Sequence, residues 1–157
     1  MSNTRVELYR QFPHLTIRPP HIDPPADASP FDWQGKINMP AIPSANIVIL
    51  SFTVPRGLNG MIKKYGNEID GGVAGAYSYA IRHDSQPFRY YSNILFSLGP
   101  VDAPVEHPLG LRVLENQVIT FVFTNTSVIP AGQSVLARVM GFYYPKEYDD
   151  PSIRIVQ

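Results

Sequence analysis

The residue types that commonly carry out acid–base chemistry or bind metals are present in this sequence but scattered. Four histidines occur, and none belongs to a His-x-His or His-Glu-x-x-His pair of the kind that binds metal: His14, His21, His83 and His107. His83-Asp84-Ser85 brings together three residue types of a catalytic triad. A triad needs side chains that converge from separate elements, whereas neighbours on one strand point to opposite faces. We therefore interpret this stretch as a polar turn.

Acidic residues and glycines give no clearer sign of a reaction. Asp70-Gly71-Gly72 lacks the spaced carboxylates of an EF-hand calcium loop. Asp102 and Glu115 each lack an obvious second carboxylate for glycoside hydrolysis. The chain has no cysteine, which excludes disulfides and thiolate metal sites. We therefore expect a protein that is not an enzyme and that binds no cofactor or metal.

Tyrosines and arginines are the remaining residues with binding chemistry. Six tyrosines in the segments that we expect to be strands would either stack on sugar rings or, as is commoner in strands, pack in cross-strand pairs: Tyr77, Tyr79, Tyr90, Tyr91, Tyr143 and Tyr144. Four arginines lie in such segments too: Arg82, Arg89, Arg112 and Arg138. We expect them to pair with carboxylates, for which the nearby candidates are Glu68, Asp70, Asp84, Glu106 and Glu115.

Length and charge narrow the classes of partner. The 157 residues fit one domain, and 44% of them are hydrophobic, enough for a substantial core. Thirteen basic residues balance thirteen acidic ones, so no net positive charge attracts nucleic acid. Residues 1–12 hold no apolar run of signal-peptide length, and no stretch approaches a membrane span. We expect a soluble protein with no targeting signal and no nucleic-acid or membrane partner.

The body of the chain, residues 44–145, has the pattern of an all-β domain. Turn signals at Pro55-Arg56-Gly57, Asp84–Pro87 and Glu115-Asn116 alternate with short β-branched or aromatic runs roughly every ten residues. Residues 66–75 and 99–108 are expected to be loops. The predicted strands are 46–54, 61–65, 76–83, 88–98, 109–114, 117–125 and 134–144. Seven or eight such strands without an amphipathic helix predict an antiparallel β-sandwich or jelly roll.

Residues 1–43 differ from the body because they contain eight of the sixteen prolines. Proline disfavours both helix and central strand, so we expect an extended arm with at most a short helix over residues 6–12. The arm is nevertheless rich in bulky apolar residues, which need a surface to bury them. Its expected partner-binding residues are Arg5, Tyr9, Arg10, Phe12, Ile17, Arg18, Phe31 and Trp33. The alternative is that Phe31 and Trp33 cap the core of the domain. Residues 146–157 are expected to form a polar tail.

The run Gln117–Asn125 is apolar on both sides, with Val118 and Val122 on one and Phe121 and Phe123 on the other. A sandwich strand with one solvated face should instead alternate apolar and polar residues. Either the core is overcrowded, or the outer face is covered by the arm or by another copy of the chain. We expect a homo-oligomer.

A series of short phrases in the body resembles the small jelly-roll structural proteins of tailed bacteriophages, of the capsid decoration (cement) or fibre-associated kind. The phrases are Val54-Pro55-Arg56-Gly57, Gly60-Met61-Ile62, Tyr65-Gly66, Ala80-Ile81-Arg82, Tyr91-Ser92-Asn93-Ile94 and residues 132–138 and 141–145. The resemblance implies a virion protein, commonly trimeric, that grips the major capsid protein or a neighbouring virion protein. A carbohydrate- or receptor-binding module of a head or tail fibre, with residues 66–75 and 99–108 at its tip, is the alternative.

Overall fold

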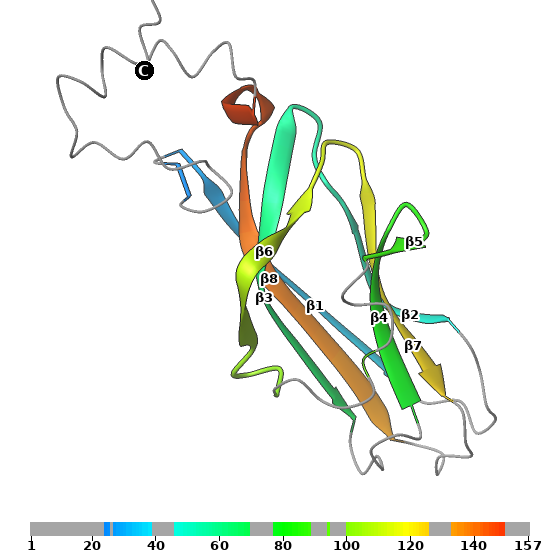
Figure 1. Cartoon of the computed structure of the whole chain (residues 1–157). Coiled ribbons are helices and arrows are strands. Elements are labelled where there is room, and N and C mark those ends of the chain that lie inside the picture. Colours follow the sequence, from blue (N-terminus) through cyan, green and yellow to red (C-terminus); the bar gives the residue numbers. More distant parts are fainter. Residues whose placement is uncertain are drawn as a thin grey trace, which may run out of the picture.

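A computed structural model describes residues 24–25, 27–38, 46–69, 77–88, 94, 100–125 and 133–149. These residues form eight strands and one short 3-10 helix, η2 (Figure 1). The elements are β1 (Ser29–Asn38), β2 (Ile47–Thr53), β3 (Leu58–Ile69), β4 (Tyr77–His83), β5 (Gln86–Pro87), β6 (Val105–Val113), β7 (Val118–Asn125), β8 (Ser134–Pro145) and η2 (Lys146–Asp149).

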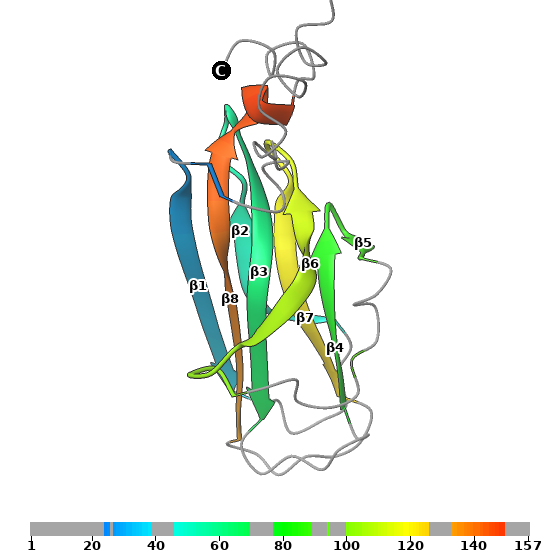
Figure 2. The same ribbon diagram turned by 60° about the vertical axis from the view of Figure 1, so that its left-hand side comes forward.

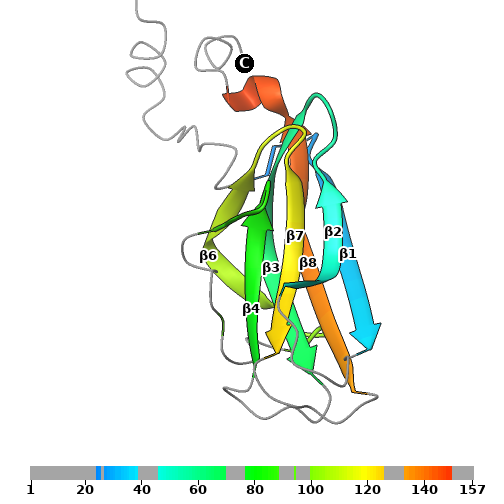
Figure 3. The same ribbon diagram turned by 90° about the vertical axis from the view of Figure 1, so that its right-hand side faces the viewer.

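The strands form two antiparallel four-stranded sheets, which confirms the predicted all-β sandwich. One sheet has the order β1-β8-β3-β6, seen side by side in Figure 2. The other has the order β2-β7-β4-β5, and its β2, β7 and β4 lie in front in Figure 3. β1 pairs with β8, β2 with β7, β3 with β6, and β4 with β5. These are the strand pairs of one long hairpin that has folded over to form two sheets. This arrangement is a jelly roll.

The space between the sheets is filled with aromatic and β-branched side chains. Tyr79, Phe121 and Phe123 are at most 1% exposed, and their rings pack edge to face at centroid distances of 5.2–5.9 Å. Ile62 and Val139 face them from the other sheet and are equally buried. Aromatic contacts of this kind add to the free energy gained by burying apolar area. The core is therefore the continuous apolar face that the strand alternation predicts.

Three tight turns lie at one end of the sandwich, at the top in Figure 1. Gly57 and Asn116 have positive φ angles of 82° and 62°, as the third residue of a type II turn requires. Asp84 and Ser85 both have positive φ and join β4 to β5 as a two-residue hairpin loop. All three turns were predicted from the sequence, and His83-Asp84-Ser85 is the polar turn that we expected.

Two predicted loops are partly wrong, because strands extend into them. β3 continues to Ile69, so residues 66–69 are strand. Gly66 is needed there because a Cβ would lie 2.9 Å from the carbonyl oxygen of Pro100. β6 begins at Val105 and includes Pro108, which an edge strand tolerates. The strand predicted over residues 88–98 lies mostly outside the described residues; of its two described positions, Phe88 donates its backbone N–H to the carbonyl oxygen of Ile81 and Ile94 forms an antiparallel bridge with Tyr79.

The predicted boundary at residue 43 is also wrong, because β1 belongs to the sandwich. Its ten residues pair with β8 from Ser29 opposite Tyr143 to Asn38 opposite Ser134. Phe31 is 8% exposed and packs on Tyr143, while Trp33 stacks on Phe52 at 5.6 Å and remains 41% exposed. Phe31 therefore belongs to the core, as the alternative expected, whereas Trp33 packs against the core with one side only. Among the described residues, no helix has the length and apolar character that crossing a membrane requires.

Candidate functional site

The chain joins and leaves the sandwich at the same end, where the three tight turns lie. β1 starts opposite the last residues of β8, since Ser29 pairs with Tyr143. η2 follows β8 directly and lies at the top in Figure 1. The backbone N–H of Lys146 donates a 3.1 Å hydrogen bond to the carbonyl oxygen of Gly57, which ties the start of η2 to the β2–β3 turn. Both terminal segments are thus connected to the body at one end.

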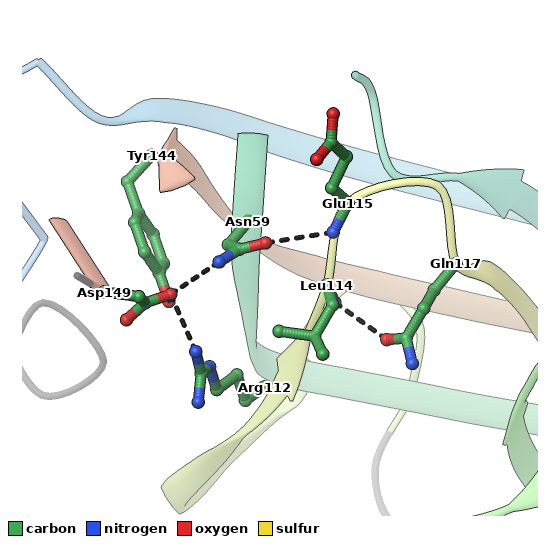
Figure 4. Close-up of polar contacts among 7 residues, drawn as sticks. All are labelled: Asn59, Arg112, Leu114, Glu115, Gln117, Tyr144 and Asp149. Atoms are coloured by element: carbon green, nitrogen blue, oxygen red, sulfur yellow. Dashed lines mark hydrogen bonds and ion pairs between the residues drawn. The ribbon is translucent and has the colours of Figure 1, made fainter. Parts of the chain in front are cut away.

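Asp149 is the centre of a polar cluster at this end, shown in Figure 4. Its Oδ2 accepts hydrogen bonds from Asn59 Nδ2 at 2.6 Å and from the Tyr144 hydroxyl at 3.0 Å, and it lies 2.9 Å from Nη2 of Arg112. The Asp149 side chain is only 12% exposed. The three partners come from β3, β6 and β8, so this one carboxylate connects η2 to three strands. We call this group the Asp149 cluster.

Glu115, in the β6–β7 turn, extends the same network. Its backbone N–H donates to Asn59 Oδ1 at 2.9 Å, and its carboxylate accepts from the Gly57 N–H at 2.7 Å and from Lys146 Nζ at 2.8 Å. The hydrogen bonds from Lys146 and Gly57 lower the pKa of Glu115 below its ordinary value. Glu115 thereby connects the β2–β3 and β6–β7 turns to Lys146, the first residue of η2.

A small apolar cluster lies on the same outer face of the β1–β8–β3–β6 sheet. Met61, Phe142 and Tyr144 are buried there, and Ala28 and Tyr148 pack against them from the segments before β1 and after β8. Burial, and the neighbouring charge of Asp149, raise the pKa of Tyr144 to about 12. The outer face at this end therefore serves as a second, smaller core that holds both terminal segments.

Further along the same face, Arg138 holds β1 and the β5–β6 connection together. Its guanidinium donates to both carboxylate oxygens of Asp32, at 2.8 and 2.6 Å, and to the Val101 carbonyl oxygen at 2.9 Å. The hydrogen bonds from Arg138 lower the pKa of Asp32. Beside this pair lies an open depression of about 290 Å³, lined by Gln34, Gly35, Lys36, Val101, Leu136, Ala137 and Arg138.

The arginines pair with acids that the sequence did not suggest. Arg138 uses Asp32 and Arg112 uses Asp149, neither of which was among the expected partners. Arg82 donates to the side-chain oxygen of Asn46 at 2.5 Å. Arg89 and Asp70 lie outside the described residues. No local pattern could have identified these pairs, because the Arg138–Asp32 contact spans 106 positions.

The tyrosine platform is excluded for four of its six members. Tyr77, Tyr79, Tyr143 and Tyr144 are at most 7% exposed, so their rings cannot stack on a bound sugar. Tyr90 and Tyr91 lie outside the described residues. Of the proposed binding tip, residues 66–69 are the last residues of β3, Pro100 and Val101 lie against Gly66, and residues 70–75 lie outside the described residues.

The outer face of β7 is partly exposed. Val118 is 40% exposed, but Val122 only 3%. Val122 pairs with Ala80 on β4 and Val48 on β2, and the Arg82 side chain runs from β4 toward Asn46. The chain itself therefore covers part of the face that we expected another copy or the arm to cover.

The expected anchors Arg5, Tyr9, Arg10, Phe12, Ile17 and Arg18 lie outside the described residues. Within the part of the chain that the structure describes, no group of three or more histidine or acidic side chains is placed to hold a metal ion. Hydrogen-bonding and apolar groups are concentrated where the terminal segments leave the sandwich, so the arrangement is suited to holding polypeptide.

No family model matches the chain, and the comparison with curated proteins found no match to it.

Proposed function

We propose that the chain is a non-enzymatic structural protein of a virion, a capsid decoration protein of the tailed-phage kind. In this role it stabilises the particle by contacts with copies of itself and by an arm, residues 1–28, that binds the major capsid protein or a neighbouring virion protein. It is assembled in the host cytoplasm and resides in the virion. Its jelly roll is a fold that viral capsid domains share with lectins and cupins, so the fold alone does not distinguish these classes.

The observation that carries the proposal is that the residues just before β1 and just after β8 are held in place at the same end of the sandwich. Asp149 and Glu115 tie η2 to β3, β6 and the turns, and Ala28 packs on the same outer face. A segment that leaves a rigid end in a set direction loses less freedom when it binds a neighbour. Linking the arm to a body that also binds raises its effective concentration at the particle.

Deletion of residues 1–23 is the sharpest test of the arm. The deletion must end there because removal of β1, which begins at Ser29, would take an edge strand and Phe31 out of the sandwich. We expect the shortened chain to keep the far-ultraviolet circular dichroism and melting temperature of the full chain. It should fail to bind virions that lack the protein. Deletion of residues 151–157 is the control, and it should leave binding intact.

Binding of the shortened chain at full strength would contradict the arm-mediated contact. The virion assignment itself is checked by mass spectrometry of purified particles, in which the protein should occur in stoichiometric amounts. Absence of the protein from such particles would overturn the assignment, whatever the arm does.

The carbohydrate- or receptor-binding alternative is favoured by the distribution of the connections. Three of the longer ones, 39–46, 70–76 and 126–133, join strand ends away from the tight turns, and 88–104 runs from β5, beside one tight turn, to the start of β6. In this alternative the anchored end holds the fibre and the opposite end meets the receptor. A glycan array distinguishes the two, because the alternative requires a specific signal and the decoration protein should give none.

A further inference from the structure

The outer edge of β1 combines a free strand edge with a sequence that is complementary to itself. β1 is the first strand in the order β1-β8-β3-β6, so β8 is its only neighbour in the described sheet. Such an edge carries unpaired backbone N–H and C=O groups that can pair with another strand. With ten residues, β1 is long for an edge strand.

The side chains of β1 alternate between the two faces. Phe31 is buried in the main core, so odd-numbered residues face inward and even-numbered ones face outward. The outward series includes Asp32, Gln34 and Lys36. Asp32 is held in place by its ion pair with Arg138 of the same chain. Lys36 is exposed and forms no ion pair within the described residues.

We propose that two copies of this chain pair antiparallel through β1, about a twofold axis at Gln34, to form one continuous eight-stranded sheet. In this register, Asp32 of each copy faces Lys36 of the other, which gives two opposite-charge cross-strand pairs. Trp33 faces Gly35, which has no side chain of its own to oppose the indole, while the carbonyl oxygen of Ile49 occupies the space where a Cβ would be. The proposal does not rest on the virion assignment.

Neighbouring registers lose this match. In the joint sheet, opposite residues must lie on the same face, so the pairing can shift only in steps of two residues. One such step moves the twofold axis from Gln34 to Trp33 or to Gly35. Pairing centred on Trp33 or on Gly35 places neither Asp32 nor Lys36 opposite an opposite charge. The register at Gln34 is therefore the one that charge complementarity selects.

The exposure of Trp33 agrees with this pairing. Its indole packs on Phe52 and donates to the Tyr143 hydroxyl at 3.3 Å, yet 41% of the residue is exposed next to the free edge. A second β1 would cover it. Proline and lysine on an edge strand also serve to prevent pairing. Lys36 would promote pairing if it faces Asp32 of a second copy, and it would prevent pairing if it only keeps the edge charged. The two experiments below distinguish these outcomes.

The first experiment measures the mass of the full chain in solution by light scattering, as a function of concentration and salt. We expect a dimer of the 17.6 kDa chain that dissociates on dilution, with a red shift in the emission of Trp33, the only tryptophan. Lys36→Glu, which places like charges opposite Asp32, should weaken the dimer by about tenfold or more. Lys64→Glu makes the same charge change on β3 and should leave the mass unchanged.

The second experiment tests the register in a chain that has no cysteine of its own. At the twofold axis, Gln34→Cys brings two thiols opposite each other, so mild oxidation should give a disulfide-linked dimer. Lys36→Cys is the control, because its two thiols would lie four residues apart along the strand, about 13 Å. A monomer at high concentration, a trimer indifferent to Lys36→Glu, or equal oxidation of the two cysteine variants would overturn the proposal.

Discussion

The inner and outer faces of the β1–β8–β3–β6 sheet are both partly apolar, but they are built differently. On the inner face, Ile62, Val113 and Val139 join one continuous core with the opposite sheet. On the outer face, Met61 and Phe142 form a small separate cluster bordered by charged and amide groups. The inner face is covered by strands, whereas the outer face is covered by short segments next to the chain termini and by part of the β5–β6 connection.

This difference separates what makes a jelly roll from what distinguishes this one. Inner contacts follow from the alternation of side chains along each strand, which any sandwich requires. Outer contacts depend on individual residues such as Asp149 and Arg138, each of which joins segments far apart in sequence. We therefore expect inner substitutions to reduce the stability of the whole domain, and outer ones to release particular segments.

Truncation of a core aromatic residue should have the largest effect. Phe121 is 1% exposed and contacts Tyr79, so Phe121→Ala should lower the free energy of unfolding by about 3–5 kcal/mol. Val118→Ala on the exposed outer face of β7 is the matched control and should change it by less than about 0.5 kcal/mol. Urea unfolding followed by circular dichroism measures both. Similar losses for the two variants would mean that the outer face of β7 is as well packed as the core.

The sequence predicted the core much better than the outer face. Alternation located β2, β4, β7 and β8 within one or two residues, and glycine and asparagine marked the turns at Gly57 and Asn116. These are local signals: a period of two, and positive φ. Both signals depend only on residues that are close together in the sequence, so they can be detected without knowing the fold.

The errors share a physical cause, because proline and glycine were taken as signs of loops. Pro30 and Pro108 lie in β1 and β6, the two edge strands of one sheet, where a missing N–H can face away from the neighbouring strand. Gly35 lies under the carbonyl oxygen of Ile49, 2.2 Å from where a Cβ would be. Such close approaches come from distant segments, as do the partners of Arg112 and Arg138, so no local pattern contains them.

Removal of the Asp149 carboxylate should have an intermediate effect confined to the outer face. Asp149→Ala leaves the buried Tyr144 hydroxyl and the Asn59 amide without this acceptor, which should cost about 1–3 kcal/mol. Hydrogen exchange should quicken at residues 146–149, while the backbone of β7 stays protected. Glu147→Ala, an exposed acid in the same helix, is the control and should change neither quantity. Equal exchange at η2 in the two variants would show that Asp149 does not hold it.

The ion pair between Arg138 and Asp32 should have the smallest effect, and that effect should depend on pH. Because Arg138 lowers the pKa of Asp32 in the folded chain, the pair stabilises the fold above the ordinary pKa of 3.8. This contribution is lost as the pH falls through the lowered value. The melting temperature of Arg138→Gln should therefore lie below that of the unmodified chain at neutral pH and approach it in acid. Arg56→Gln, an exposed arginine in the β2–β3 turn, should show no such convergence. A difference for Arg138→Gln that persisted unchanged at low pH would mean that its contact with the Val101 carbonyl oxygen, rather than the charge of Asp32, is what stabilises the outer face.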